Sequence, residues 1–340
     1  RNFVYPQYVL DSTAKNATSC KGADKELKLE GCYGGLPFPI PKTGNQVMWN
    51  HLLAYEQNAA AGVNETYIVP AAGKPVFVGK SASKQYRPFL DPEKAGPFPS
   101  ELVFWKTYIE DLAPARAVGG KLVIIDSLDM LKTGRRAFSY IPGQRRVKLS
   151  PDLQYDTPHP YSGGAGTMDD AKIFLGALDR FDFKLIGKKE KYIYYNNFNL
   201  NDAKACSTET LLSTKGFPHP DCVRWELHRV WVVEATLKPG FRHIYKKRIF
   251  YWDEDSYAAG QAENYDAGGK LFRFVFGSFF PYFDGPGGNG DSTHYLDLQT
   301  GIYSVSGSGS CKACGWWSIK KEAIDPMLFS PEAMAGAGIR

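Results

Sequence analysis

The sequence lacks the features that would assign it to several large classes of protein. No uninterrupted apolar run approaches the roughly eighteen residues that a membrane-spanning helix needs, so we expect no such helix. The excess of positive charge is also small, because the chain has 41 Lys and Arg residues and 36 Asp and Glu residues, which gives a formal net charge of +5. A nucleic-acid-binding protein usually carries a basic stripe or a recognisable module. Neither is visible, and we expect no nucleic-acid partner.

Sequence motifs of catalysis are missing as well. The chain has no H-E-x-x-H, no G-x-S-x-G, no phosphate-binding loop and no dinucleotide fingerprint. Its six histidines are scattered, and the nearest approach to a cluster is His228 and His243, with Glu226 nearby, on strands that a hairpin could place side by side. An ordinary polar patch is favoured there over a metal or proton-transfer site. We therefore expect no catalytic residues, no cofactor and no metal, and a protein that is not an enzyme.

Aromatic residues, by contrast, are abundant at 14% of the chain, and they favour strands. Short β-branched and aromatic runs are separated by Gly, Pro and Ser, and the longest, "VRWELHRVWVVEATL", alternates over residues 223–237. Tight turns such as "KPG" and "YDAGG" connect the later runs, which predicts an antiparallel meander. A sheet this wide must curl, and its concave face must be filled by helices, by a ligand or by both.

Two helices are predicted. Residues 44–57 carry apolar side chains at helical spacing. Residues 167–178 begin with Thr167 as an N-cap, followed by Asp169 and Asp170 in the first turn, where carboxylates meet the positive end of the helix dipole. A helix start is favoured there over a catalytic carboxylate pair. A terminal helix or turn is expected near the C-terminus, interrupted by two prolines.

The N-terminal region is predicted to contain a polar loop followed by an extended strap. Residues 1–35 are polar, and alternating prolines between residues 37 and 41 prevent sheet pairing. Trp49, Asn50 and His51 follow on the predicted helix, where adjacent side chains point in different directions. Anchoring of the helix by these three residues is therefore favoured over catalysis.

The six cysteines fall into three pairs that are close in sequence, as expected if each pair closes its own loop in an oxidising compartment. The pairs that are close in sequence are Cys20 with Cys32, Cys206 with Cys222, and Cys311 with Cys314, although the sequence does not fix the connectivity. The last pair could also be a redox motif or half of a zinc site, but it follows the flexible "SVSGSGS", and a structural bridge is favoured. Because residue 1 is Arg, we expect a processed or trimmed chain.

Four segments resemble a Gram-negative domain family of unknown function, whose members are often labelled outer-membrane lipoprotein-sorting proteins. They are "GGLPFPIPKTGNQVMWNH", "PGQRRV", "LDRFDFKLIGKKEKYIYYNN" and "RWELHRVWVVEATLKPGFRHIYKKRIFYWDEDS". The resemblance covers residues 34–320. It implies a mainly β fold like that of the periplasmic carriers LolA and LolB, an incomplete antiparallel barrel with helices over its concave face. Residues 34–340 would form this single domain, after an N-terminal extension over residues 1–33.

The resemblance also implies a place in the cell envelope. Genes of that family often accompany an inner-membrane exporter of the resistance-nodulation-division type and an outer-membrane barrel, and the family has no agreed catalytic residues. We therefore expect a periplasmic carrier or adaptor, which could be associated with the outer membrane and binds a lipid, an acyl chain or a similar hydrophobe. Alternatives are a solid interaction protein that docks to an envelope transporter and an enzyme acting on lipids or glycans.

The residues predicted to line the ligand cavity come from the aromatic strands and from the two helices. Alternation separates the two faces of the sheet without saying which one is concave. The predicted lining residues are Met48, Phe174, Trp225, Leu227, Trp231, Val233, Phe250 and Trp252.

Overall fold

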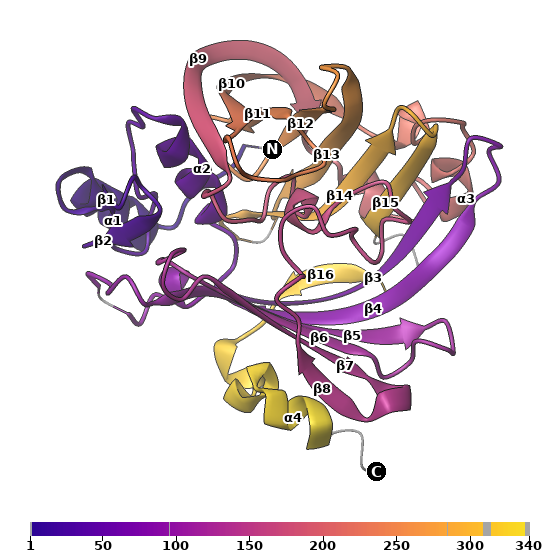
Figure 1. Ribbon diagram of the computed structural model, residues 1–340, viewed down its shortest axis with the longest axis horizontal. Helices are drawn as coiled ribbons and strands as arrows, with labels where there is room; N and C mark the ends of the chain where they lie inside the picture. The colour runs from indigo at the N-terminus through magenta and orange to yellow at the C-terminus, as the bar shows by residue number, and fades with distance from the viewer. Residues whose placement is uncertain (1, 95, 284, 309–313, 337–340) are drawn as a thin grey trace.

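The protein, described by a computed structural model over residues 2–94, 96–283, 285–308 and 314–336, is built on one large antiparallel sheet (Figure 1). Thirteen strands lie side by side in the order β8-β7-β6-β5-β4-β3-β15-β14-β13-β12-β11-β10-β9, and β16 pairs with β3. The strands are β3 (Ala59–Val69), β4 (Val76–Tyr86), β5 (Val103–Ala113), β6 (Lys121–Ser127), β7 (Arg135–Ile141), β8 (Arg146–Leu149), β9 (Phe181–Tyr194), β10 (Trp225–Leu237), β11 (Lys247–Asp253), β12 (Gly260–Tyr265), β13 (Leu271–Pro281), β14 (Gly288–Asp297), β15 (Ile302–Ser308) and β16 (Gly315–Ser318). A separate two-stranded sheet contains β1 (Lys21–Ala23) and β2 (Lys28–Glu30).

The large sheet does not close on itself. Strands β8 and β9 are its two edges, and among the described residues no ladder joins them. Every strand pair is antiparallel, and the sheet curls strongly, with β9 bent over the top of the view in Figure 1. The predicted fold class, a mainly β incomplete barrel built from an antiparallel sheet, is therefore confirmed.

The sheet consists of two meanders that meet edge to edge. Strands β3–β8 form one meander and β9–β15 the other, and β15 joins them by pairing with β3, where Val305 lies opposite Tyr67. The chain passes from the first meander to the second through residues 150–180, which we call the roof segment because they run across the hollow between the two halves (Figure 1). The predicted tight "KPG" turn is wrong, because residues 238–246 separate β10 from β11.

The predicted helix over residues 44–57 exists but is shorter. Helix α2 (Gly44–Leu52) begins after Thr43, whose hydroxyl accepts a hydrogen bond from the Gln46 backbone N–H. This cap satisfies one of the donors that a helix start leaves without an intrahelical partner. The helix packs against β9 and β10 on the concave side of the sheet.

The predicted helix over residues 167–178 is wrong. Only one 3-10 turn, Met168–Asp170, forms there. Lys172 and Ile173 have positive φ angles of 53° and 72°, which an α-helix does not allow. An irregular segment therefore covers the part of the concave face where the sequence predicts a second helix.

The predicted polar loop over residues 1–35 is also wrong, because α1 (Gln7–Ser19) lies within it. Asn16, which is buried on this helix, donates hydrogen bonds to the carbonyl oxygens of Tyr33 and Leu36, both at 3.0 Å, and accepts one from the Tyr33 N–H at 2.7 Å. The polar side chain thus ties the helix to the chain that follows it. The division into an extension and a domain at residue 34 stays a prediction.

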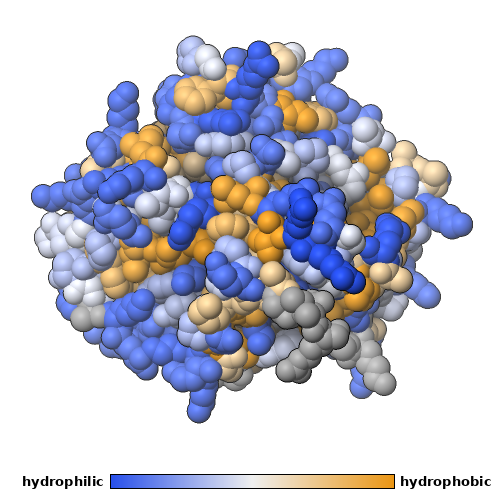
Figure 2. All heavy atoms as spheres, turned by 60° about the horizontal axis from the view of Figure 1, so that its bottom comes forward, coloured by the Kyte–Doolittle hydropathy of each residue, from blue (hydrophilic) through white to orange (hydrophobic). Residues whose placement is uncertain are grey.

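Buried apolar residues form three clusters. The main core fills the concave side and draws on α1, α2, the roof segment and both meanders. A second cluster lies on the opposite face of β5 and β6, beneath the segment that ends in α4 (Pro331–Gly336). Viewed from that side, the surface shows separate apolar patches among hydrophilic side chains (Figure 2). A third cluster lies beneath the segment that contains α3 (Thr208–Leu211).

Disulfides stabilise two of the loop segments. Cys20 is bonded to Cys32 and Cys206 to Cys222, which confirms two of the predicted pairs. Cys311 lies outside the described residues, so its pairing stays a prediction. Among the helices of the described ranges, none has the length and apolar character required to cross a membrane.

Candidate functional site

An open cavity lies between the roof segment and the concave face of the sheet, over the first meander and the adjoining strands β14 and β15. It encloses about 850 Å³ of space, its mouth included. The residues that line it include Asn64, Thr66, Ser81, Ser83, Gln85, Trp105, Thr107, Ile109, Leu122, Ile124, Arg135, His159, Tyr161, Met168, Lys172, Leu175, Thr293, Tyr295 and Ser306.

The polarity of this lining changes across the sheet. Because residues opposite each other in a ladder share one face, the register places Ser83 beside Ile109 on β5, and Ile109 beside Leu122 on β6. Strands β5 and β6 contribute an apolar wall, which consists of Trp105, Ile109, Leu122 and Ile124. Strands β3, β4, β14 and β15 contribute a hydroxyl stripe, which consists of Thr66, Ser81, Ser83, Thr293 and Ser306, together with the amide of Asn64. The cavity therefore has one apolar and one hydrogen-bonding side.

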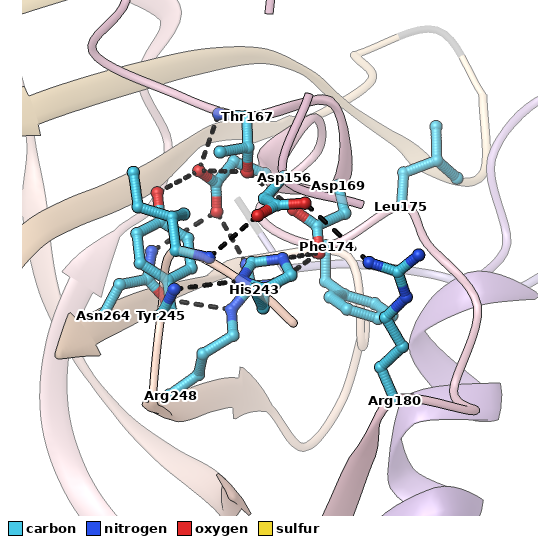
Figure 3. A network of polar contacts seen from close by, with 12 residues as sticks. Asp156, Thr167, Asp169, Phe174, Leu175, Arg180, His243, Tyr245, Arg248 and Asn264 are labelled. Atoms are coloured by element: carbon cyan, nitrogen blue, oxygen red, sulfur yellow. Dashed lines mark hydrogen bonds and ion pairs between the residues drawn. The ribbon is translucent and has the colours of Figure 1, made fainter. Parts of the chain in front are cut away.

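A buried network of charges holds the roof segment to the second meander (Figure 3). Arg248 on β11 donates to Asp169 Oδ2 at 2.9 Å and to Asp170 Oδ1 at 2.6 Å. His243 Nε2 lies 3.0 Å from Asp169 Oδ2, and the Tyr245 hydroxyl donates to Asp170 Oδ2 at 2.6 Å. We call these five residues the roof latch, since both carboxylates belong to the roof and their partners to β11 and the chain before it.

The roof latch is almost completely shielded from water. The side chains of Asp169, Asp170, Arg248 and His243 are at most 3% exposed. Burial by itself raises the pKa of Asp169, but the nearby Arg248 and His243 outweigh it and hold that pKa well below its ordinary value. Both carboxylates are thus closed off from any substrate, and their geometry supports a structural role.

Two further ion pairs hold cationic side chains that line the cavity. Arg135 holds Asp126 through two hydrogen bonds of 2.8 and 2.7 Å and donates to the Leu175 carbonyl oxygen of the roof at 3.0 Å. Lys172 of the roof donates to Glu56 at 2.7 and 2.5 Å. The cations that line the cavity therefore already have carboxylate partners.

This arrangement can bind a molecule that is partly apolar. The apolar wall offers burial to an alkyl chain, and the hydroxyl stripe offers hydrogen bonds to a polar group. No group of three or more His, Cys, Asp and Glu side chains among the described residues is placed to hold a metal ion.

The structure separates the eight predicted lining residues into two sets. Met48, Phe174, Val233, Phe250 and Trp252 are buried in the main core, whereas Trp225 and Leu227 are exposed and Trp231 is half-buried. None of them is among the residues that line the open cavity, although Phe174 lines a smaller cavity beside it. Their role in ligand binding stays a prediction.

One face of β10 accounts for this separation. Along that face Trp225 and Leu227 are exposed, whereas Val233 and Leu237 are buried. Helix α2 packs against β10, and the other face of the strand also contributes buried core residues, Val230 and Val232. Alternation therefore separates the two faces of β10 but does not show which positions along them are covered.

The Trp49-Asn50-His51 stretch anchors α2, as the sequence predicts. Trp49 Nε1 donates to a backbone oxygen at 2.7 Å, and Asn50 both donates to and accepts from the backbone of Phe38. The His51 ring stacks on Trp252 with 3.5 Å between ring centroids. Burial lowers the pKa of His51 to about 4, so its ring is neutral at neutral pH.

The structure does not place His228 beside His243 across a hairpin, an arrangement that the sequence left open. His243 precedes β11, which begins at Lys247, and belongs to the roof latch. His228 instead lies 2.9 Å from Asp253 Oδ1, and this hydrogen bond raises the pKa of its ring. The two histidines thus belong to different polar networks.

Sequence reasoning missed the roof latch and the residues that line the open cavity. A signal for the roof latch was present in the sequence. Because side chains alternate between the two faces of a strand, Arg248 lies on the same face as the aromatic residues Phe250 and Trp252. A cation on a core-facing position requires an acidic partner. A weaker signal for the cavity is "SASKQ", where Ser81, Ser83 and Gln85 alternate with the other face of β4.

Comparisons with known proteins agree on one family and one fold. A family model described as "Protein of unknown function (DUF1329)" matches residues 1–335. An uncharacterized protein of Pseudomonas aeruginosa is 34% identical over 360 aligned positions, which cover 100% of this chain and 73% of that protein.

Two crystal structures show the same fold at low sequence identity. A putative outer membrane lipoprotein-sorting protein domain from Vibrio parahaemolyticus is similar over 85% of this chain and 97% of its own, with a TM-score of 0.55 and 12% identity. A DUF1329 family protein from Desulfovibrio piger is similar over 86% of this chain and 97% of its own, with a TM-score of 0.55 and 14% identity.

Proposed function

The chain belongs to the DUF1329 family of proteins of unknown function, and from that premise we propose that it is a carrier that shelters a lipid or similar hydrophobe in the open cavity. The observation that carries the proposal is the cavity itself, which has an apolar wall on one side and the roof segment above. Each buried methylene contributes about 0.8 kcal/mol, so about ten of them correspond to micromolar affinity before the costs of association.

The proposed setting is the cell envelope. The two disulfides favour an oxidising compartment such as the periplasm. The protein would hand its cargo between an inner-membrane exporter of the resistance-nodulation-division type and an outer-membrane barrel without chemical conversion. The fold shared with a putative lipoprotein-sorting domain supports a role in lipid traffic.

Filling the cavity is expected to abolish cargo binding. Ser83 is buried in the hydroxyl stripe, and Ser83→Trp would place a large ring in the space beside Ile109. Native mass spectrometry of gently purified protein should show bound lipid for the wild type and at least a tenfold lower occupancy for this variant.

The neighbouring Lys84 provides the matched control, because it is exposed on the other face of β4. Lys84→Trp adds the same ring to the same strand, and we expect it to keep wild-type occupancy. Lipid retained by Ser83→Trp at the wild-type level would place the cargo elsewhere. A wild-type protein that carries no lipid and binds no fatty-acid probe would contradict the carrier function.

A second candidate function is docking to an envelope transporter, and one surface favours it. Tyr192, Trp225 and Leu227 on β9 and β10 form an exposed apolar stripe, with exposed fractions of 61%, 42% and 54%. Exposed aromatic residues of this kind are typical of contact sites between proteins.

Loss of this stripe is expected to weaken docking while leaving the cavity unchanged. The double variant Trp225→Ser, Leu227→Ser should lose most of its cross-linking to a membrane partner and keep its bound lipid, because neither residue lines the cavity. Unchanged cross-linking would exclude this surface as the contact site. Loss of lipid together with docking would instead indicate a disturbed fold.

A further inference from the structure

We propose that the cargo is an amphiphile whose uncharged polar group binds at Thr107 and His159, with its alkyl chain along the apolar wall. This inference rests on the proposed carrier function and names the chemical class of the cargo. It differs from the binding of a plain hydrocarbon in requiring hydrogen bonds at a defined point of the cavity.

Thr107 lies at the boundary between the polar and apolar sides of the cavity. On β5 it stands between Trp105 and Ile109, and the register places Gln85 on one side of it and Ile124 on the other. The residue is 2% exposed, and its Oγ1 atom has no hydrogen-bond partner within the described part of the chain. A buried hydroxyl without a partner is costly, so native proteins rarely keep one without a reason.

Two neighbouring polar groups, Ser81 and Gln85, already have partners. The Ser81 hydroxyl donates to Asn64 Oδ1 at 3.3 Å, and Gln85 Oε1 accepts from Trp105 Nε1 at 3.2 Å. Among the described cavity-lining residues, the buried side-chain polar atoms without a partner are Thr107 Oγ1 and His159 Nδ1. These two atoms are therefore the ones that a bound molecule would satisfy.

The charges around the cavity favour an uncharged polar group. Arg135 and Lys172 are each held by a carboxylate, so neither offers an unsatisfied charge to an anionic head group. Burial lowers the pKa of His159 to about 4, and its ring is therefore neutral at neutral pH. A hydroxyl and a neutral imidazole can each donate or accept a hydrogen bond, which suits an ester or hydroxyl group.

Thr107→Val tests this assignment, because it removes the hydroxyl while keeping the shape of the side chain. The probes are 1-monolauroylglycerol and dodecane, whose carbon chains have the same length when the carbonyl carbon of the lauroyl group is counted, each measured by displacement of the dye N-phenyl-1-naphthylamine. We expect the variant to bind 1-monolauroylglycerol about tenfold more weakly, which is about 1.4 kcal/mol, and dodecane as the wild type does. Thr107→Ser should restore binding of the glyceride.

Two controls separate binding from folding. Thr236 is exposed on β10, and Thr236→Val should leave the affinity for both probes unchanged. Thermal unfolding of ligand-free Thr107→Val should occur at a temperature no lower than that of the wild type, since the variant removes an unpartnered hydroxyl. A structural role for Thr107 would instead lower that temperature.

The possible failures are distinguishable. If both probes bind the wild type and Thr107→Val weakens neither of them, or weakens both equally, the polar-group assignment is overturned and the carrier function stands. If neither probe binds the wild type, the carrier function fails and this inference fails with it.

Discussion

Arg248→Met is expected to lower the free energy of unfolding by about 3–5 kcal/mol, because it leaves two carboxylates buried without their cation. The guanidinium contacts both Asp169 and Asp170, and it also donates to Asn264 Oδ1 at 2.9 Å. Urea denaturation at pH 7 measures the loss. The matched control is Arg116→Met, which removes an exposed arginine and should change the stability by less than about 0.5 kcal/mol.

The pH dependence of stability provides a second readout of the same network. The pKa of Asp169 is lowered in the folded protein, mainly by Arg248 against the opposing effect of burial. Its contribution to stability is therefore present above the unfolded pKa of about 3.9 and is lost as the pH falls through the folded value. In Arg248→Met, burial without the cation favours the protonated carboxyl, so the loss of stability on going from pH 7 to pH 4 should be smaller than in the wild type.

A second comparison of stabilities separates the cost of leaving two buried carboxylates without a cation from the cost of losing the charged groups altogether. The triple variant Asp169→Asn, Asp170→Asn, Arg248→Met removes all three ionised groups together, and we expect it to be more stable than Arg248→Met alone. If Arg248→Met were as stable as the wild type at pH 7, the roof latch would not be the structural anchor that its geometry indicates.

Trp252→Ala is expected to cost about 3–5 kcal/mol, the range measured when large aromatic side chains are truncated in a core. Trp252 is completely buried, stacks on His51 and donates from Nε1 to Met48 Sδ at 3.4 Å. Its loss removes the surface on which α2 rests, so amide hydrogen exchange should accelerate over Gly44–Leu52 as well as in β11.

Two variants check that this effect depends on burial and on ring size. Trp252→Phe keeps an aromatic ring beside His51 and should lose less stability than Trp252→Ala. Leu227→Ala truncates an apolar side chain of the same sheet that is 54% exposed, and we expect only a small loss. Equal losses for Trp252→Ala and Leu227→Ala would contradict the assignment of α2 and its tryptophan contact to the core.

The candidate site could be predicted from the sequence only in part. The helix anchor at Trp49, Asn50 and His51 was predicted because helical geometry alone determines that adjacent side chains diverge. The residues that line the open cavity were not predicted, because the serines among them look like surface residues of a strand. Their burial results from the roof segment, which reaches them from a distant part of the chain.

The sequence by itself determined most of the strands, their antiparallel pairing and the start of α2, and it indicated two disulfides without fixing their connectivity. These features depend on alternation, turn residues, capping and short loops, all of which act between residues close in the chain. The tertiary structure alone decided which positions along β10 are covered, how residues 150–180 cross the concave face and which groups meet there. Arg248 and Asp169 are 79 residues apart, and only the curl of the whole sheet brings them within 2.9 Å.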